Sequence, residues 1–273
     1  MKTIFGVIGN PVEHSLSPSM HNSAFRKLNM DCVYHAFRVA PQDVRGAVLG
    51  AKSLGFGGLN VTVPLKEKVL ELVDADPIAK EIGAVNTIDF KSGVTGHNTD
   101  GIGAKQALEK HNIGVKDKRV LLLGAGGAAR AIAFQLAHEG ADIIIANRTA
   151  SRAIKLAQDV RSVGNVIGTG LKDLSKLVDK AEILINSTST GMHPDINKTL
   201  VTADQMRPEL VVFDIVYNPV ETQLLKEVKK AGALAIDGVD MLVHQGAESF
   251  RIWTGVEAPI DIMEDAVRCA LKC

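Results

Sequence analysis

Residues 119–149 read RVLLLGAGGAARAIAFQLAHEGADIIIANRT, and this stretch decides the fold. An apolar strand pattern ends at Gly124, a helical pattern follows, and a second β-branched run ends at Asn147. The intervening turn has the G-x-G-x-x-A spacing of dinucleotide-binding proteins, in its required strand–turn–helix context. Gly124 permits a tight turn, Gly126 lets the backbone approach a pyrophosphate, and Ala129 allows the helix to pack closely. The helix N-terminus offers N–H groups to phosphates, so the stretch predicts a dinucleotide site.

The end of the second strand favours NADP over NAD. A chain that binds the free ribose of NAD has an acidic residue at this point. This chain has Asn147, Arg148 and Thr149 instead, with Arg152 one helical turn later. A guanidinium binds a 2′-phosphate through charge-assisted hydrogen bonds, whereas a carboxylate repels it. The alternative interpretation is that both arginines belong to an ordinary solvated face.

Length and composition narrow the class of protein. The 273 residues suffice for two domains at roughly 150 residues each. The 31 basic and 31 acidic side chains cancel, which argues against nucleic acid or an anionic membrane as a partner. No uncharged apolar stretch reaches the roughly 18 residues that a membrane helix needs. The cysteines (Cys32, Cys269 and Cys273) and the eight histidines lack metal-binding spacing. We therefore expect a cytoplasmic protein without a structural disulfide or a metal site.

Short apolar strands alternate with helical stretches along most of the chain, which predicts α/β domains with mostly parallel sheets. The predicted strands are residues 3–9, 33–39, 57–63, 84–90, 93–98, 119–124, 142–147, 182–187, 210–215 and 233–236. Only Lys91 and Ser92 separate the fourth strand from the fifth, which predicts a hairpin. A helix from about Asp100 places the domain boundary at about residue 101. Residues 239–273 form two predicted helices, which composition alone assigns to neither domain.

Three polar clusters in the first hundred residues are candidates for a substrate site. Ser15 and Ser17 stand two apart in a loop, where both hydroxyls could bind one carboxylate. Helix capping, with Ser17 as N-cap and Pro18 at the first helical position, is the favoured interpretation of this motif alone. The second cluster is GLNVTVPLK (58–66) and the third is GHNTDG (96–101). The third lies at a strand end, where open α/β sheets bind ligands.

Lys66 and Asp100 form the one well-placed pair of opposite charges near these strand ends. Lys66 falls in the first turn of a predicted helix, where a cation opposes the helix dipole unless an anion compensates it. A lysine beside an aspartate can hold a ketone oxygen and supply its proton as a hydride reaches carbon. A surface salt bridge is the alternative interpretation of the pair.

Nine segments in order resemble the shikimate dehydrogenase family over almost the whole chain. They are GNPVEHSLSPSMHNSAF, GLNVTVPLK, IGAVNT, GHNTDGIG, GAGGAARA, NRT, NSTSTGM, DIVYNP and DGVDMLVHQGAESFRIWTG. The resemblance implies NADPH-dependent, reversible reduction of 3-dehydroshikimate to shikimate, in the pathway to chorismate and aromatic amino acids. It implies an α/β substrate domain (1–100 with 240–273), a Rossmann-like NADP domain (101–239) and a cleft between them. Monomer and homodimer both stay open.

The resemblance also assigns residues to roles. Lys66 and Asp100 become the catalytic pair, and Ser15 and Ser17 the carboxylate binders. The other substrate residues are Thr62, Asn86, Tyr217 and Gln245, and Lys66 and Asp100 also touch substrate. The cofactor residues are Gly124, Ala125, Gly126, Gly127, Ala128, Ala129, Asn147, Arg148, Thr149, Arg152, Thr188, Ser189, Met192, Val216, Gly238 and Met241.

Three alternatives remain. A quinate/shikimate dehydrogenase that uses NAD would have an acidic residue near Asn147. A methylenetetrahydrofolate dehydrogenase-like enzyme shares the two-domain shape, but SLSPSMHNSAF (15–25) argues against it. A non-catalytic nucleotide sensor would not need Lys66 and Asp100 beside the serine pair.

Overall fold

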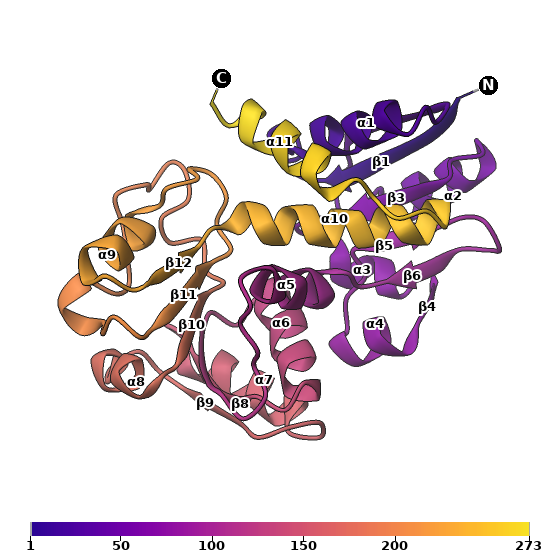
Figure 1. Cartoon of the computed structure of the whole chain (residues 1–273). Helices are drawn as coiled ribbons and strands as arrows, with labels where there is room; N and C mark the ends of the chain where they lie inside the picture. Colours follow the sequence, from indigo (N-terminus) through magenta and orange to yellow (C-terminus); the bar gives the residue numbers. More distant parts are fainter. Residues whose placement is uncertain (1, 273) are drawn as a thin grey trace. The chain divides into compact units, whose positions relative to one another are not determined.

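The computed structural model describes residues 2–272, which form two compact α/β units (Figure 1). The first unit comprises the chain up to Asp100 and the residues from Val243 onward, and the second comprises Gly101–Leu242. The chain passes between the units within two helices, α5 (Asp100–Lys110) and α10 (Gly238–Thr254). The sequence interpretation put these crossings after residues 100 and 239. Cys273 lies outside the described residues.

The first unit contains a mixed six-stranded sheet in the order β2-β1-β3-β5-β6-β4. Its strands are β1 (Thr3–Gly9), β2 (Cys32–Arg38), β3 (Gly58–Val61), β4 (Asp74–Ala75), β5 (Thr87–Asp89) and β6 (Thr95–His97). β1 is parallel to β2 and β3, and β4 is parallel to β6, whereas β5 is antiparallel to both of its neighbours. Thr87 pairs with His97 and Asp89 with Thr95, which confirms the predicted hairpin. The hairpin brings Asn86 and the segment after His97 together.

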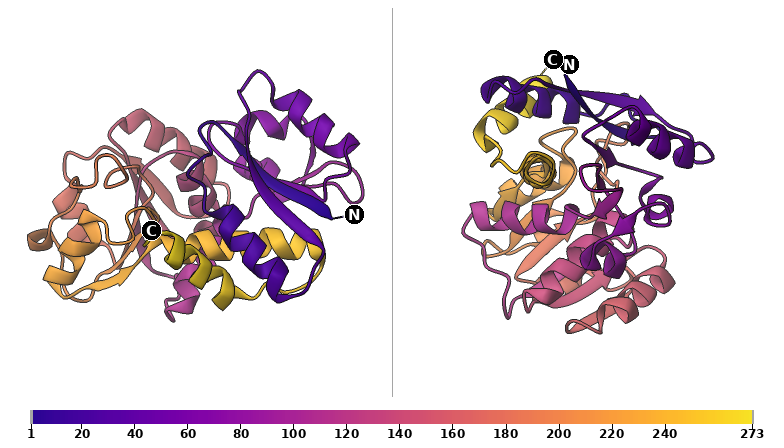
Figure 2. Two further views of the ribbon diagram at one scale, coloured as in Figure 1. Left: turned by 90° about the horizontal axis from the view of Figure 1, so that it is seen from above. Right: turned by 90° about the vertical axis from the view of Figure 1, so that its right-hand side faces the viewer.

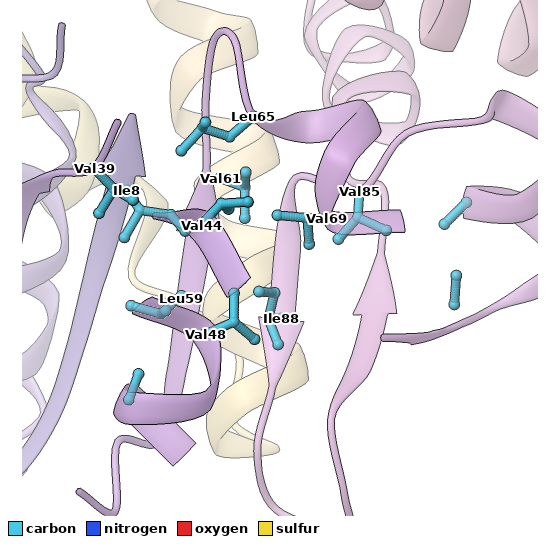
Figure 3. Packing of buried hydrophobic residues seen from close by; sticks show 13 residues of the cluster. Ile8, Val39, Val44, Val48, Leu59, Val61, Leu65, Val69, Val85 and Ile88 are labelled. Carbon is cyan, nitrogen blue, oxygen red and sulfur yellow. The ribbon is translucent and has the colours of Figure 1, made fainter. Parts of the chain in front are cut away.

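Helices cover this sheet with two kinds of side chain. α2 (Val44–Ser53), α3 (Lys66–Leu70) and α4 (Pro77–Ile82) bury an aliphatic core against it. α1 (Ser17–Lys27) and the last part of α10 pack aromatic rings against Phe5, and α11 (Ile260–Ala270) packs on α1. α1 and α11 lie side by side, although they are far apart in the sequence (Figure 2). One core cluster joins Ile8 and Leu59 of the sheet to Val48 of α2 and to Leu65 and Val69 at α3 (Figure 3). This packing fixes α3, and therefore Lys66, against the sheet.

The second unit contains a fully parallel sheet in the order β12-β11-β10-β7-β8-β9. Its strands are β7 (Arg119–Leu123), β8 (Asp142–Ala146), β9 (Val166–Thr169), β10 (Ile183–Asn186), β11 (Val211–Asp214) and β12 (Leu234–Ile236). Besides α5, its helices are α6 (Gly127–His138), α7 (Ala150–Val160), α8 (Leu174–Lys180), the 3₁₀ turn η1 (Ala203–Gln205) and α9 (Gln223–Ala231). Numbered from β7, the order is 3-2-1-4-5-6, the Rossmann arrangement, whose ligands bind where the order reverses, beyond β7 and β10.

The sequence interpretation missed two strands. β4 is only two residues long, and β9 contains Gly168 in place of an apolar run. A Cβ at Gly168 would lie 2.3 Å from the carbonyl oxygen of Ala153, so close packing on α7 requires glycine there. The predicted strand 57–63 is also shorter, because Thr62 follows β3 in the turn that leads to α3.

The predicted cap of α1 was wrong. Ser17 is the first helical residue, and the N-cap position belongs to Leu16, whose side chain makes no capping hydrogen bond. The hydroxyl of Ser15 instead accepts the N–H of Ser17 at 3.3 Å. Within residues 2–272, no helix is both long enough and apolar enough to cross a membrane.

Candidate active site

Lys66 and Asp100 are in contact. The Lys66 Nζ lies 2.5 Å from Oδ2 of Asp100, and their side chains are 20% and 8% exposed. Lys66 is the first residue of α3 and Asp100 the first residue of α5. A carboxylate is favourable at a helix N-terminus, and this one also compensates the ammonium that the dipole of α3 disfavours. The pair is therefore a mostly buried ion pair, unlike the exposed pairs that contribute little.

Asn86 holds the other oxygen of the same carboxylate. Its Nδ2 donates to Oδ1 of Asp100 at 2.8 Å and to the hydroxyl of Thr99 at 3.0 Å. The backbone N–H of Asp100 donates to Oδ1 of Asn98 at 3.1 Å. Both carboxylate oxygens of Asp100 thus accept hydrogen bonds, which fixes the orientation of the carboxylate. Three of the predicted site residues, Lys66, Asn86 and Asp100, form one connected group.

Thr62 and Gln245 belong to the same unit. Thr62 is half-buried and follows β3. A Cβ on Gly9 would lie 2.4 Å from the methyl carbon of Thr62, so the two residues approach closely. Gln245 is half-buried on α10, and its backbone oxygen accepts the hydroxyl of Ser249 at 3.0 Å.

Ser15 and Ser17 are close in space at the start of α1. The Ser15 hydroxyl oxygen accepts the backbone N–H of Ser17 at 3.3 Å. Ser15 is half-buried and Ser17 is 7% exposed. A hydroxyl that accepts one hydrogen bond keeps its own proton for donation, so the Ser15 hydroxyl can still donate to a ligand.

The glycine turn of the second unit has the geometry of the dinucleotide fingerprint. Gly124 has φ +116°, and a Cβ there would lie 2.6 Å from the hydroxyl of Ser187 beyond β10. Gly126 and Gly127 are exposed, with nothing within 4 Å of a built Cβ, whereas Ala129 is fully buried in α6. The turn thus leaves open space at the start of α6, where the first N–H groups lack intrahelical acceptors.

The arginines at the end of β8 are exposed cations. Arg148 follows the half-buried Asn147, whose Nδ2 donates to the backbone oxygen of Thr149 at 3.0 Å. Arg148 and Arg152 have no carboxylate within salt-bridge distance among residues 2–272. Arg152 lies in the first turn of α7, where the helix dipole favours an anion over a cation. Both arginines are therefore available to bind a phosphate.

Two loops beyond the sheet are tied together by buried polar groups. Asn186 donates through Nδ2 to Oδ1 of Asp214 at 2.9 Å, and its own Oδ1 accepts the Thr188 hydroxyl at 2.7 Å. The Thr222 hydroxyl donates to Oδ2 of Asp214 at 2.6 Å, and the Val216 N–H donates to Oδ1 at 3.2 Å. Burial raises the pKa of Asp214 to about 6, although these hydrogen bonds lower it.

The remaining predicted cofactor residues lie on or beside these loops. The backbone oxygen of Ser189 accepts the backbone N–H of Met192. The side chain of Met192 is 46% exposed. Gly238 packs against the next loop, since a Cβ there would lie 2.4 Å from the oxygen of Ile215. Met241 is buried. Tyr217 is half-buried, and its own burial raises the pKa of its hydroxyl. Ala125 and Ala128 are half-buried in the glycine turn.

Sequence reasoning missed the groups that hold the site residues. The groups are Tyr34, Thr87, Asn186, Asp214 and Ser249. Their hydrogen-bond partners lie on elements far away in the sequence, so no local pattern marks these buried bonds. Among residues 2–272, no group of three His, Cys, Asp or Glu side chains could hold a metal ion.

A Rossmann unit joined to an α/β unit with a buried lysine–aspartate pair defines a class, the nicotinamide-dependent oxidoreductases. Three family models match the chain: the shikimate dehydrogenase substrate binding domain over residues 7–88, shikimate/quinate 5-dehydrogenase over 105–242, and the shikimate 5′-dehydrogenase C-terminal domain over 238–268. The chain belongs to the shikimate dehydrogenase family.

Relatives and solved structures agree with this membership. The chain is 56% identical to a shikimate dehydrogenase (NADP(+)) of Methanosarcina acetivorans, covering 100% of both chains. It is 58% identical to that of Methanococcoides burtonii, over 98% of each. A Thermus thermophilus shikimate 5-dehydrogenase, solved with NADP(H) and shikimate, has a TM-score of 0.90 and 37% identity, covering 98% of this chain and 100% of that one.

Proposed function

We propose that this chain catalyses the NADPH-dependent, reversible reduction of 3-dehydroshikimate to shikimate. The Lys66–Asp100 pair carries the proposal, since a buried ammonium beside an ionised carboxylate suits the reduction of a ketone. The family membership and the unpaired arginines after β8 support it. The reaction belongs to the pathway that leads to chorismate and the aromatic amino acids.

The second unit fits NADP. The exposed glycines of the turn leave room for a pyrophosphate, and Arg148 and Arg152 are free to bind a 2′-phosphate. Thr188, Ser189 and Met192 lie beyond β10, at the reversal of strand order where this fold binds its ligands. When bound, NADPH supplies the hydride that reduces the carbonyl carbon.

Lys66 handles the proton. Its ammonium stabilises the negative charge that grows on the carbonyl oxygen, and it donates a proton to that oxygen. Asp100 holds the ammonium in place from 2.5 Å, while Asn86 fixes the carboxylate from the other side. In the reverse direction Lys66 accepts the proton of the hydroxyl.

The remaining first-unit residues bind the substrate. Ser15 and Ser17 bind its carboxylate. Ring hydroxyls are held by Thr62, Asn86, Asp100 and Gln245. Ser15, Thr62 and Gln245 are half-buried, so each keeps some exposed surface at which a ligand can bind.

A quinate/shikimate dehydrogenase that uses NAD is the alternative function. The structure of a Corynebacterium glutamicum quinate dehydrogenase with NAD has a TM-score of 0.92 and 31% identity, covering 98% of this chain and 99% of that one. Asn147, Arg148 and Thr149 oppose this alternative, because no acidic residue stands at the end of β8 to bind a free 2′-hydroxyl.

The proposal also covers the cellular location and the oligomeric state of the enzyme. We place the enzyme in the cytoplasm, a reducing compartment that suits a chain without a cysteine framework. We also propose that it works as a monomer or a homodimer, the two states that the family resemblance leaves open. Light scattering after gel filtration measures the oligomeric state.

The Lys66→Ala variant tests the proposed mechanism. The variant should lose at least about a hundredfold in kcat for NADP⁺-dependent oxidation of shikimate, because general-acid and charge-stabilising roles are each worth roughly that much. Its KM for NADP⁺ should stay within about threefold of wild type, since the arginines and the glycine turn are untouched. Lys68→Ala, an exposed lysine on the same helix, is the matched control. A folded Lys66→Ala variant whose kcat is within about tenfold of wild type would contradict the assignment.

A further inference from the structure

A set of buried polar side chains connects Asn86, the partner of Asp100, to neighbouring strands and to α10. Its members come from neighbouring strands and from α10: Tyr34, Asn60, Thr87, Asn86 and Ser249. Tyr34, Thr87 and Ser249 are fully buried, and Asn60 is 7% exposed. Buried polar groups are costly unless they are hydrogen-bonded, so such a group must be almost fully satisfied.

The orientation of Asn60 is fixed by an acceptor that cannot donate. Its Nδ2 lies 3.2 Å from the backbone oxygen of Asn86, so the amide nitrogen must face that way. Its Oδ1 then faces Tyr34, whose hydroxyl donates to it at 2.7 Å. The same Nδ2 also donates to the hydroxyls of Thr87 at 3.1 Å and Ser249 at 3.0 Å.

The orientation of Asn86 is fixed by a donor that cannot accept. The backbone N–H of Thr99 lies 2.8 Å from Oδ1 of Asn86, so the amide oxygen must face Thr99. Its Nδ2 is thereby turned toward Asp100, to which it donates at 2.8 Å. The hydroxyl of Thr87 donates to the same Oδ1 at 2.9 Å.

Thr87 therefore joins two fixed amides. Its oxygen accepts from Asn60 and its proton goes to Asn86, so every hydrogen bond from Tyr34 to the carboxylate of Asp100 runs in one direction. Bonds aligned in this way polarise and strengthen one another. Strand pairing places Thr87 directly opposite Asn60, on the antiparallel β3–β5 ladder.

We infer that Thr87 is a positioning residue for the reaction: its hydroxyl locks the amide of Asn86, and through it the carboxylate of Asp100, in the orientation that serves Lys66. Ser249 supports the same group from α10, because its hydroxyl accepts from Nδ2 of Asn60 at 3.0 Å and donates to the backbone oxygen of Gln245 at 3.0 Å. This inference rests on the proposed function of the Lys66–Asp100 pair.

Replacement of Thr87 by valine and by serine tests the inference. Thr87→Val keeps the shape but removes the hydroxyl, and kcat with shikimate and NADP⁺ should fall about tenfold, while the KM for NADP⁺ stays within about twofold. Thr87→Ser retains the hydroxyl and should restore kcat to within about threefold of wild type. Thr254→Val, which removes a half-buried hydroxyl from α10 away from the pair, is the control for general loosening.

Two results would overturn the inference. One is a Thr87→Val variant that keeps wild-type kcat, and the other is an equal loss of kcat in Thr87→Val and Thr254→Val. If Thr87→Val does not fold, Thr87→Cys replaces it, since a thiol fills similar space but donates weakly. Wild-type enzyme in the same assay separates the two proposals, because an inactive wild type refutes the function and an active one leaves only Thr87 in question.

Discussion

At the scale of single residues, Ser15 and Ser17 place two hydroxyl groups at the start of α1. The Ser15 oxygen accepts the backbone N–H of Ser17 and keeps its own proton for donation. Two neutral hydroxyls can each donate to one carboxylate, and hydrogen bonds to a charged acceptor are stronger than those to a neutral one. The pair is therefore suited to a ligand with a carboxylate.

The Ser17→Ala variant should bind shikimate more weakly and NADP⁺ normally. Loss of one charge-assisted hydrogen bond corresponds to a rise of about tenfold or more in the KM for shikimate. Steady-state kinetics with each ligand varied in turn measures this split, and Ser19→Ala, an exposed position on the same helix, is the control. Ser15→Ala should behave in the same way. If both variants keep the wild-type KM and only melt at lower temperature, their role is to support α1.

The Arg148→Ala variant should distinguish the two nicotinamide cofactors. A guanidinium–phosphate bond is worth about 1.5–3 kcal/mol, so affinity for NADP⁺ should fall roughly tenfold to a hundredfold. NAD⁺ lacks the phosphate and should bind as before. Titration calorimetry with both cofactors gives the two constants, with Lys172→Ala, an exposed cation of the same unit, as the control. Equal losses for NADP⁺ and NAD⁺ would mean that Arg148 has no phosphate to bind.

At the scale of elements, Asp214 connects the loops that follow β10 and β11. It accepts hydrogen bonds from Asn186, Val216 and Thr222, and it has no exposed surface. Thr222 is also the N-cap of α9, since its side chain accepts the N–H of Leu225. One carboxyl group thus fixes two loops and the start of a helix.

The pKa of Asp214 predicts a pH dependence of stability. Burial raises this pKa from 3.8 to about 6, so the folded state retains a proton that the unfolded state releases between these values. Stability therefore falls as pH rises from about 4 to 6, by about 3 kcal/mol for this group. In the Asp214→Asn variant this contribution should be absent, and Asp265→Asn, an exposed position, should keep it. Thermal unfolding across this range measures the difference, and parallel curves for wild type and Asp214→Asn would contradict the assignment.

The sequence predicted most elements because their signals are local. The alternation of apolar strands and helices gave ten strands near their observed places, and the spacing around Gly124 gave the Rossmann turn. β9 was missed because the packing of Gly168 on Ala153 is a tertiary contact. The proximity of Lys66 and Asp100 was predictable from strand ends. The hydroxyl of Thr87 was not, because its partners come from β3, the residue before β5 and α10.

At the scale of the whole molecule, the division into two compact units coincides with the division between predicted substrate residues and predicted cofactor residues. All predicted cofactor residues fall within Gly101–Leu242. The predicted substrate residues fall in the other unit, except Tyr217. We propose that the first unit binds the substrate and the second binds the cofactor, with the boundaries after Asp100 and before Val243.

The most direct test is the specificity of the purified chain for four pairs of ligands. Shikimate and quinate are each offered with NADP⁺ and with NAD⁺, and kcat/KM is measured from the near-ultraviolet absorbance of the reduced cofactor. We predict that shikimate with NADP⁺ exceeds every other pair by at least about tenfold, because only this pair uses the arginines after β8. A higher kcat/KM for quinate with NAD⁺, or no turnover of shikimate with NADP⁺, would contradict the proposed function.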